Sequence, residues 1–303
     1  MTDPIPAQRG RTAVVTGANS GLGLVTATEL ARHGARVILA VRNPRAGEEA
    51  AAGIRRTVPG AALEVRELDL ASLASVRAFA TALTADIPAL DLLVNNAGLV
   101  LLGPPQTTAD GFELHLGTNM LGHFALTGLL LDALTRAPGV PRVVSLSSIT
   151  HKNARLDPDD LMSRRDFGAS RAYGRSKLAT TIFALELDRR LRAAGSPVLS
   201  VLAHPGLTRT NLTPRAWTHR PRLGHLAARA GLLVTQPVSQ GALPQLYAAT
   251  APGVRGGQFF GPSGLGETRG HVTEVKPSKR AADPAAGRHL WAAAQDLTGV
   301  TYL

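Results

Sequence analysis

The 303-residue sequence contains no cysteine, and this absence excludes several kinds of chemistry at once. A chain without thiols has no disulfide, no thiolate nucleophile and no cysteine-based zinc site. No cluster of His, Asp and Glu at metal-ligand spacing replaces them, so we expect no metal. The composition is compatible with a reducing compartment.

Long apolar runs are also missing. No run approaches the ~18 residues of a membrane-spanning helix, and the start, MTDPIPAQRGRTAVV, lacks an apolar signal core behind a basic end. We therefore expect a cytoplasmic protein with no membrane partner. A hydrophobic content of 44% is ample for a large core that needs no disulfide or metal to hold it together.

Acidic residues are outnumbered, with 22 Asp and Glu against 33 Lys and Arg, which gives a net charge of +11. Such a charge raises nucleic acid as a partner. Aromatic residues make up only 4% of the chain and do not interleave a basic strip, so we expect no nucleic-acid partner. We interpret the basic stretch 215–229 as a solvated face, with a lid over an anionic ligand as the alternative.

Short runs of Val, Ile, Leu and Ala alternate with helix-period segments through the first two-thirds of the chain. The helical segments include residues 20–33, which Gly34 is placed to end, and residues 44–57. Apolar strands separated by helices indicate an α/β fold, a doubly wound parallel (Rossmann) sheet of about seven strands covered on both faces. Ligands bind at the carboxyl ends of such strands. The expected strands are residues 12–17, 35–41, 62–70, 91–98, 142–148 and 198–206.

We expect one domain with three parts. Residues 10–207 form the core with the motifs, residues 208–237 an excursion that serves as a substrate-side lid, and residues 238–303 complete the fold. The Gly- and Pro-rich region 254–277 is expected to be mainly loop, with GQFF as a last strand. A final helix near 284–297 carries three residues on its core face, Leu290, Trp291 and Leu297.

Tyr173 and Lys177 lie four residues apart in a segment that is expected to be a helix. Positions i and i+4 share a helix face, so the phenol and the ammonium group can enter the same cleft. A nearby cation lowers a tyrosine pKa from its usual value near ~10. Such a tyrosine exchanges protons near neutral pH, as acid–base chemistry on an alcohol or ketone requires. Alone the pair is a weak signal, because this spacing also arises by chance.

A glycine-rich turn connects the first strand to the first helix, with the spacing G-x-x-x-G-x-G. Glycines permit the tight turn and let backbone N–H groups approach a pyrophosphate, which the helix N-terminus then faces. The alternative is a plain glycine-rich turn without a ligand. The cofactor contacts that we expect here are Gly17, Asn19, Ser20, Gly21, Leu22 and Gly23.

Arg42 stands at the tip of the second strand, where no carboxylate is present. Enzymes that use NAD place an acidic residue there for the ribose 2′-hydroxyl, whereas enzymes that use NADP replace it with room and a cation. A guanidinium can hold the 2′-phosphate by charge-assisted hydrogen bonds. The residue therefore favours NADP(H) over NAD(H), with a solvent-facing loop arginine as the alternative.

Together these motifs resemble those of the short-chain dehydrogenase/reductase family, over roughly residues 10–210. The gap of twenty-five residues between Ser148 and Tyr173 (173 − 148) is longer than is usual in the family. This insertion, with HPG and the tail GPSGLGETRG…LWAAAQDLTGV, is similar to the retinol-dehydrogenase-like branch. The other motifs of the resemblance are Asn95-Asn96-Ala97-Gly98, Asn119 in TNMLGHF, Ser148 in SLSSIT and Pro205-Gly206.

The resemblance implies four catalytic positions. Tyr173 would donate the proton in reduction and accept it in oxidation, and Lys177 would lower its pKa and hold the nicotinamide ribose. Ser148 would hydrogen-bond the substrate oxygen; it is preferred to Ser147 because the family's serine is the second of such a pair. Asn119 would hold a water that links Lys177 to solvent, with an ordinary helix amide as the alternative.

The resemblance also implies cofactor contacts beyond the glycine turn. Asp69 would meet the adenine amino group, with a helix N-cap near Ser72 as the alternative or additional role. Asn95 and Ala97 would line the adenosine side, and Thr210 would bind the nicotinamide amide. The remaining cofactor contacts are expected at Leu70, Gly98, Tyr173, Lys177, Pro205 and Gly206.

The sequence thus predicts an NADP(H)-dependent oxidoreductase that transfers hydride between nicotinamide and a carbonyl or alcohol of a lipophilic small molecule. A catalytically silent nucleotide sensor or scaffold on the same fold is the alternative. A hydrolase is not favoured, because no G-x-S-x-G surrounds Ser148 although His151 lies nearby. The family resemblance favours a homodimer or homotetramer.

Apolar residues in the expected lid are the basis for a lipophilic substrate. Packing of the lid onto the core is the other interpretation of the same residues, and the sequence leaves the two open. The residues in question are Leu212, Trp217, Leu223, Leu226, Leu232 and Leu233.

Overall fold

An eight-stranded sheet forms the centre of the protein, whose computed structural model describes residues 5–208 and 235–303. The strand order is β3-β2-β1-β4-β5-β6-β7-β8, and every pair is parallel except β7 with β8. Because the chain crosses from β3 to β4, the topological switch point lies between β1 and β4. The strands are β1 (Thr12–Thr16), β2 (Arg36–Val41), β3 (Leu63–Glu67), β4 (Leu92–Asn95), β5 (Arg142–Leu146), β6 (Leu199–Ala203), β7 (Phe259–Pro262) and β8 (Val272–Glu274).

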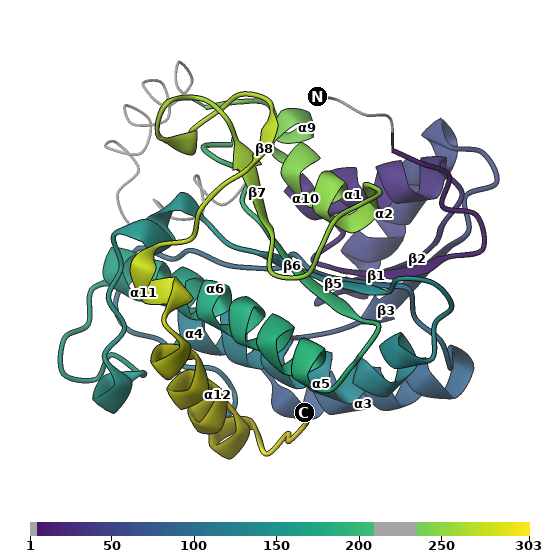
Figure 1. The fold of residues 1–303 in the computed structure, drawn as a ribbon. Helices are drawn as coiled ribbons and strands as arrows, with labels where there is room; N and C mark the ends of the chain where they lie inside the picture. The colour runs from purple at the N-terminus through teal and green to yellow at the C-terminus, as the bar shows by residue number, and fades with distance from the viewer. Residues whose placement is uncertain (1–4, 209–234) are drawn as a thin grey trace.

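Helices cover both faces of this sheet, so the domain has three layers (Figure 1). Each helical layer packs on its own buried cluster of apolar residues. The longer helices of one layer are α1 (Gly21–Arg32), α2 (Pro44–Thr57) and α10 (Leu243–Thr250). Those of the other layer are α3 (Leu73–Asp86), α5 (Gly122–Thr135), α6 (Ala169–Ala193) and α12 (Pro284–Thr298).

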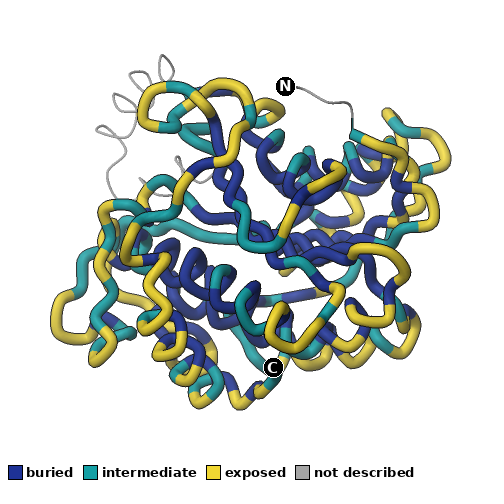
Figure 2. The backbone as a smooth tube through the Cα atoms, in the orientation of Figure 1, coloured by how far each residue is buried: buried dark blue, intermediate teal, exposed yellow. Residues whose placement is uncertain are grey.

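The central strands are apolar on both sides, as strands buried between two layers must be. In β1 the side chain of Val14 belongs to the core under α5 and α6, whereas its neighbours Ala13 and Val15 belong to the core under α1 and α10. This alternation follows from the two-residue period of a strand. Figure 2 shows the buried backbone concentrated in the sheet and along the helices against it.

Short helices complete the fold around the carboxyl ends of the strands. They shape the loops that carry most of the expected site residues. They are α4 (Leu114–Leu116), the π-helix η1 (Gly117–Leu121), the 3-10 helices η2 (Ile149–Lys152), η3 (Pro158–Asp160) and η4 (Leu265–Glu267), and the α-helical segments α9 (Val238–Gly241) and α11 (Lys279–Ala282).

The expected elements of the first two-thirds of the chain are confirmed. The helix expected over 44–57 is Pro44–Thr57, with Asn43 accepting the Ala46 N–H at its N-terminus. The helix expected to end at Gly34 is α1, and Gly34 has a φ of 95°. Apart from β2, which ends at Val41 as expected, these strands are shorter than expected at their carboxyl ends, because there the chain leaves the ladder to form the loops that carry the motifs.

One strand was missed. β8 lies in the region expected to be mainly loop, and it pairs antiparallel with β7 at the edge of the sheet. It has three residues, none of them buried, so it carries no apolar run that a sequence reading could detect. Across the described ranges, no helix has the length and apolarity needed to cross a membrane.

Candidate active site

The glycine-rich turn lies at the switch point, between β1 and the N-terminus of α1 (Figure 1). Gly17 and Gly21 have φ angles of 66° and 56°, a left-handed conformation that residues with a Cβ rarely adopt. At Gly23 a Cβ would lie 2.4 Å from the Gly17 carbonyl oxygen, so the close packing requires glycine. Ser20 is the N-cap of α1, yet its side chain makes no capping hydrogen bond within the described chain. The first N–H groups of α1 therefore suit an anion.

Arg42 lies beside this turn. The Gly17 N–H donates to the Ala40 carbonyl at 2.8 Å, which binds the turn to the end of β2. Arg42 is the first residue beyond β2; it is exposed, and no acidic residue in the described part of the chain forms an ion pair with it. Among the other residues of the turn, Leu22 is buried in the core, whereas Asn19 is half-buried.

Asp69 follows β3 and does not cap the next helix. Ser72 is the N-cap of α3, and its hydroxyl accepts the Ser75 N–H at 3.3 Å. Asp69 instead accepts the Ala71 N–H on its Oδ1 at 2.9 Å, which closes a small turn. The N-cap role considered for Asp69 is therefore wrong, since the hydroxyl nearer the helix takes that place. Leu70, also expected at the cofactor, is buried.

Thr16 organises the Asn-Asn-Ala-Gly loop, a role that sequence reasoning missed. Its hydroxyl oxygen accepts the N–H groups of Asn96 and Ala97 at 3.0 and 2.8 Å. Asn95 directs its side chain away from the loop, with its Nδ2 donating to the Thr127 hydroxyl on α5 at 3.0 Å. Because the Asn95 side chain is buried against α5, only the backbone of Asn95 remains available to contact a cofactor. The T-G pair of the turn motif was the available signal for Thr16.

Helix α6 brings Tyr173 and Lys177 to the ends of β4 and β5, next to Ser148. The side chain of Ser148 hydrogen-bonds the Tyr173 phenol. Ser147 turns the other way, and its hydroxyl lies 2.7 Å from that of Thr181 inside the protein. The two serines thus diverge as residues at the end of a strand should, and Ser148 is the one that lies with the tyrosine.

Lys177 is 5% exposed, and its Nζ donates to the Leu146 carbonyl at 2.9 Å. Burial lowers the pKa of Lys177 to about 8. Burial raises the pKa of Tyr173, and the hydrogen bond from Ser148 opposes this shift only in part. The expectation that Lys177 lowers the pKa of Tyr173 is therefore not met in the protein alone, because desolvation of the phenol outweighs the other contributions.

Asn119 lies in the π-helix η1, a local widening that often marks functional positions. Its Oδ1 accepts the Leu99 N–H at 2.8 Å, and its Nδ2 donates to the Ser176 hydroxyl at 2.9 Å. A Cβ on Gly98 would lie 3.3 Å from both Asn119 Oδ1 and Lys177 Nζ. Gly98 therefore adjoins both the amide and the ammonium group, and the water expected between Asn119 and solvent stays a prediction.

His123 is a second residue that sequence reasoning missed. Its Nδ1 lies 3.0 Å from the Asn119 carbonyl oxygen, and its Nε2 lies 3.0 Å from the Thr16 hydroxyl. Because a carbonyl only accepts, Nδ1 carries the hydrogen and Nε2 accepts from the hydroxyl. Burial lowers the pKa of His123 to about 4, so the ring is neutral. It connects the glycine turn to the backbone of Asn119, and its motif TNMLGHF was the available signal.

Pro205 and Gly206 follow β6 on the opposite side of the switch point. Gly206 has a φ of 62°, which requires glycine. The Pro205 carbonyl accepts from the Gln236 Nε2 at 2.7 Å and from the Thr208 hydroxyl at 2.8 Å, so the two ends of the expected lid meet here. Thr210, expected at the nicotinamide amide, lies outside the described residues, as does most of that lid.

Glu267 connects the loops on this side. Its carboxylate accepts from the ammonium group of Lys152, at the end of η2, and from His204 Nε2 at 2.9 Å. The Gly206 N–H donates to His204 Nδ1 at 3.2 Å, so Nε2 carries the ring hydrogen. Burial lowers the pKa of His204 to about 4, which keeps the ring neutral. Glu267 lies in the region expected to be loop, within the tail GPSGLGETRG, and no role was predicted for it.

These groups form one site at the carboxyl ends of β1, β2, β4, β5 and β6. It offers backbone donors for an anion, a cation near the end of β2, a phenol hydrogen-bonded to a serine hydroxyl, and a buried ammonium group one helical turn beyond the phenol. Such a set can bind a dinucleotide and exchange a proton at a substrate oxygen. Within the described ranges, no three His, Asp or Glu side chains are grouped so as to hold a metal ion.

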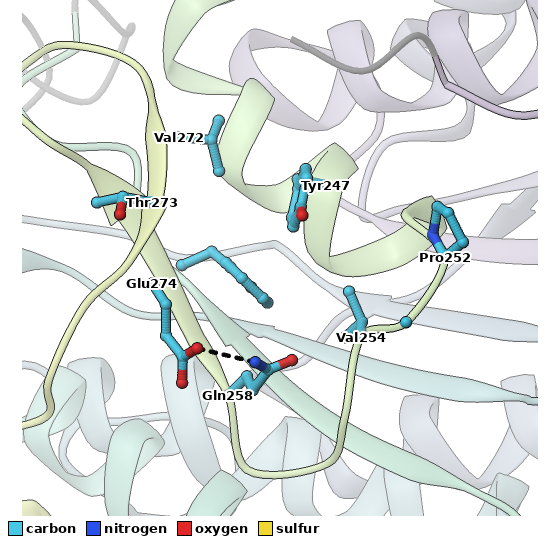
Figure 3. Close-up of a pocket in the computed structure, with 9 residues that line it drawn as sticks. Tyr247, Pro252, Val254, Gln258, Val272, Thr273 and Glu274 are labelled. Atoms are coloured by element: carbon cyan, nitrogen blue, oxygen red, sulfur yellow. Dashed lines mark hydrogen bonds between the residues drawn. The ribbon is translucent and has the colours of Figure 1, made fainter. Parts of the chain in front are cut away.

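A separate pocket of about 200 Å³ lies between α10 and the edge strands β7 and β8 (Figure 3). Tyr247 of α10, Val254 and Val272 supply apolar walls, and a hydrogen bond of 2.8 Å from Gln258 to Glu274 crosses its floor. No residue expected at the active site lines it, and we assign it no function.

Comparison with known proteins gives consistent matches. The family model described as short chain dehydrogenase matches residues 11–221. Polyprenol dehydrogenase of Mus musculus is 43% identical over 302 residues, which span 97% of this chain and 86% of that protein. Retinol dehydrogenase 14 of Homo sapiens is 40% identical over 310 residues, which span 96% of this chain and 87% of that protein.

Solved structures give the same picture. A crystal structure of an uncharacterized protein from Mycobacterium paratuberculosis superimposes with a TM-score of 0.81 at 42% identity, over 99% of this chain and 97% of that chain. An active-site complex of RhlG with NADP, from Pseudomonas aeruginosa, has a TM-score of 0.63 at 26% identity, over 85% of this chain and 96% of that chain.

Proposed function

The chain belongs to the short-chain dehydrogenase/reductase family, and on that premise we propose that it is an NADP(H)-dependent enzyme that reduces a ketone or aldehyde of a lipophilic small molecule. The observation that carries the proposal is the convergence of Ser148, Tyr173 and Lys177 beside an uncapped helix N-terminus at the switch point. Curated relatives named for polyprenol and retinol support an alcohol or carbonyl of an apolar molecule as the substrate.

The residues at the switch point fit a nicotinamide dinucleotide. The pyrophosphate would lie against the N-terminus of α1, where Ser20 leaves the backbone donors uncapped and Gly23 allows a close approach. Arg42 would hold a 2′-phosphate, since it is exposed and without an acidic partner among the described residues. The NADP complex of RhlG supports the same choice. When bound, the nicotinamide supplies the hydride.

Tyr173 would supply the proton. In reduction the carbonyl oxygen gains a proton from the Tyr173 hydroxyl while the carbonyl carbon gains the hydride, which yields an alcohol. Ser148, which is hydrogen-bonded to the phenol, would donate to the carbonyl oxygen of the substrate and stabilise the charge that develops there. Burial raises the pKa of Tyr173, which keeps the phenol protonated at neutral pH, as a general acid must be. Lys177 would hold the ribose and return a proton to the phenolate.

The test is a spectrophotometric assay. Loss of NADPH absorbance is followed against a panel of lipophilic ketones, aldehydes and quinones, with NADH in parallel and Tyr173→Phe beside each reaction. Turnover with NADPH that Tyr173→Phe abolishes supports the proposal. Failure to bind either nucleotide would refute it.

The preference for NADPH has its own test in Arg42→Asp. The carboxylate repels a 2′-phosphate and can accept from a ribose 2′-hydroxyl, so the ratio of kcat/KM for NADPH over NADH should fall at least about tenfold, the equivalent of one charge-assisted hydrogen bond. Arg45→Asp, on the exposed surface of α2 nearby, is the matched control. An unchanged ratio in Arg42→Asp would show that the 2′-phosphate is held elsewhere.

A catalytically silent nucleotide sensor is the second candidate. It would bind NADPH tightly yet turn over nothing in the panel. The retained set of Asn119, Ser148, Tyr173 and Lys177 favours the enzyme, because a sensor has no use for a phenol and a serine placed to share a substrate oxygen.

A further inference from the structure

A buried histidine–carboxylate pair lies beside the tyrosine of the site. His115 and Glu113 are 3% and 5% exposed, and His115 Nδ1 lies 2.7 Å from Glu113 Oε1. The His115 ring meets the Tyr173 ring edge to face, with 6.3 Å between centroids. Neither residue has a part in the proton transfer described above.

The hydrogen bonds of this pair fix the tautomer of the histidine ring. The Leu101 N–H donates to His115 Nε2 at 3.1 Å, so Nε2 is an acceptor and Nδ1 carries the hydrogen that Glu113 accepts. Burial would raise the pKa of Glu113, but hydrogen bonds from His115 and from two backbone N–H groups hold that pKa below its usual value. Because a backbone group occupies Nε2, the ring holds a loop in place and is not free to take a proton from substrate.

The loop that His115 holds runs along the tyrosine–lysine face of α6. Gly98 adjoins Lys177 Nζ, and both backbone groups of Leu99 are bonded to the Asn119 side chain, at 2.8 and 3.2 Å. Two residues further on, Leu101 reaches His115 beside Tyr173. Three anchors in four residues therefore fix this stretch of backbone against the proposed reaction site.

The side chains of this stretch are apolar but not buried. Four large apolar residues in a row, Leu99 to Leu102, are each only partly covered. Binding pockets for small molecules are mainly apolar with a few placed polar groups. This stretch is anchored through His115 beside the Tyr173 ring, so its partly covered side chains are placed to supply such an apolar surface. A substrate whose carbonyl oxygen meets Tyr173 must place part of its carbon skeleton close to these residues.

We propose that Glu113 and His115 are positioning residues that hold Leu99–Leu102 as the apolar wall of the carbonyl pocket, and that this wall selects substrates with an alkyl or other apolar group next to the carbonyl. The inference rests on the proposed function for the identity of the substrate. It goes further in assigning the selectivity to a loop and to the buried pair that fixes it.

The test measures how activity depends on the length of the apolar group. Straight-chain methyl ketones from butanone to decanone are assayed with NADPH, and the logarithm of kcat/KM is plotted against carbon number. In the unsubstituted chain each added CH2 in contact with the wall should raise kcat/KM about two- to fourfold. His115→Leu keeps the bulk of the side chain but removes the nitrogen that accepts the Leu101 N–H. The wall then loses this anchor, and the gain in kcat/KM per CH2 should fall towards onefold. A loss of folded protein lowers all rates equally and leaves the gain unchanged.

Three further variants test whether the loss of gain in His115→Leu comes from the wall. His115→Gln retains an acceptor at the position of Nε2 and should restore most of the gain per CH2. Leu99→Ala shortens the wall directly and should reduce the gain, whereas Val140→Ala, on an exposed side chain elsewhere, should not. A gain that is the same in the unsubstituted chain, His115→Leu and Leu99→Ala would overturn the proposal.

Binding separates this inference from the proposed function. The same ketones are titrated by calorimetry into Tyr173→Phe and into Tyr173→Phe/His115→Leu, with and without NADPH. If the unsubstituted chain reduces no ketone but the gain in affinity per CH2 depends on His115, the wall stands and the proposed reaction fails. If affinity does not depend on chain length in either variant, the wall is refuted whatever the enzyme reduces.

Discussion

Lys177 lies inside the protein with its ammonium group bonded to a backbone carbonyl, and burial lowers its pKa from 10.5 to about 8. The four-residue spacing with Tyr173 predicted that the two groups share a helix face, and they do. The spacing could not predict the direction of the tyrosine shift, because desolvation depends on how many atoms surround the phenol in the folded chain. Sequence reasoning at the residue scale therefore finds the reacting groups better than it finds their pKa values.

This burial should make stability depend on pH through Lys177. Between the folded pKa of about 8 and the ordinary value of 10.5, the unfolded chain keeps a proton that the folded chain has released. Stability therefore rises with pH through that window. Tyr173, whose pKa burial raises from 10.0, opposes this rise only above its ordinary value.

We expect Lys177→Met to remove this rise. Denaturant unfolding measured at several pH values above 8 and below 10, the window set by these two pKa values, should give a flatter profile for Lys177→Met than for the unsubstituted chain. Lys276→Met, at an exposed lysine, should retain the rise. Equal slopes in the two variants would mean that Lys177 titrates in the folded protein as it does in water.

At the scale of elements, the turn between β1 and α1 was predicted in detail, because the positions that need glycine are visible in the sequence. Other elements leave no such trace. The π-helix that carries Asn119 results from one extra residue in a helical turn, and a periodicity of apolar residues does not reveal it. The role of Glu267 was missed for a related reason, since it depends on two segments far away in the chain.

Gly23→Ala should abolish dinucleotide binding. The new Cβ would lie 2.4 Å from the Gly17 carbonyl oxygen and 2.5 Å from Asn96 Nδ2, so α1 must move away from the turn that receives the pyrophosphate. Binding of NADPH, followed by its fluorescence, should weaken by more than about 100-fold, the cost of about 3 kcal/mol of overpacking. Gly53→Ala, within α2 and without a close neighbour, should bind normally and gain up to about 1 kcal/mol of stability.

Weak binding in both variants would point to a general loss of folding, and normal binding in Gly23→Ala would show that the turn does not contact the nucleotide.

Glu267→Gln should slow catalysis without changing the substrate preference. The carboxylate accepts from both Lys152 and His204, whereas a glutamine must turn its N–H group towards one of these donors. The turn after Ser148 and the loop after β6 then lose their common anchor. A misplacement of reacting groups by about 1 Å can cost as much as about 100-fold in kcat.

Glu274→Gln on β8 is the control and should keep kcat, because among the described residues this carboxylate accepts from Gln258, and the amide oxygen of glutamine can still do so. If both substitutions left kcat unchanged while the Glu267→Gln protein still folded, Glu267 would have no part in placing these loops.

At the scale of the whole molecule, the two cores and the sheet between them follow from the alternation of strands and helical segments, which is visible in the sequence. Seven of the eight strands were expected from the sequence, and the helix expected near 284–297 is α12, with Leu290 and Trp291 buried. The chain end beyond it was not predicted. The centroid of the Tyr302 ring lies 4.8 Å from that of Trp291, and the Tyr302 hydroxyl donates to the Phe124 carbonyl at 3.1 Å. Local patterns do not encode the second contact, because its two residues are 178 positions apart.

The distribution of titratable groups between these cores leads to a prediction for acid stability. His123, between the glycine turn and Asn119, and His204, between β6 and Glu267, each have a pKa lowered by burial from 6.5 to about 4. Between pH 6.5 and about 4, these histidines bind protons in the unfolded chain but not in the folded chain. The stability that depends on neutral histidine is therefore complete above the unfolded value and is lost as pH falls towards the folded value.

Four carboxylates with lowered pKa values act in the same direction but at lower pH, below their ordinary values of 4.5 for Glu and 3.8 for Asp. They are Glu64, Glu113, Asp160 and Glu267. The histidine window therefore lies mostly above that of the carboxylates. Burial also lowers the pKa of His151, which adds to the acid sensitivity in the same direction. Each of the first two histidines corresponds to on the order of 3 kcal/mol across the full window.

We expect the free energy of unfolding, measured by denaturant at several pH values between 4.5 and 6.5, to fall with decreasing pH in the unsubstituted chain. His123→Asn and His204→Asn should each be less stable at neutral pH but lose less on acidification, because asparagine keeps one hydrogen bond at the position of Nδ1 and binds no proton. His289→Asn, at an exposed histidine, should leave the profile unchanged. If neither buried substitution reduces the acid sensitivity, the two rings take up protons in the folded state, and the polar connections that they make across the site must tolerate a positive charge.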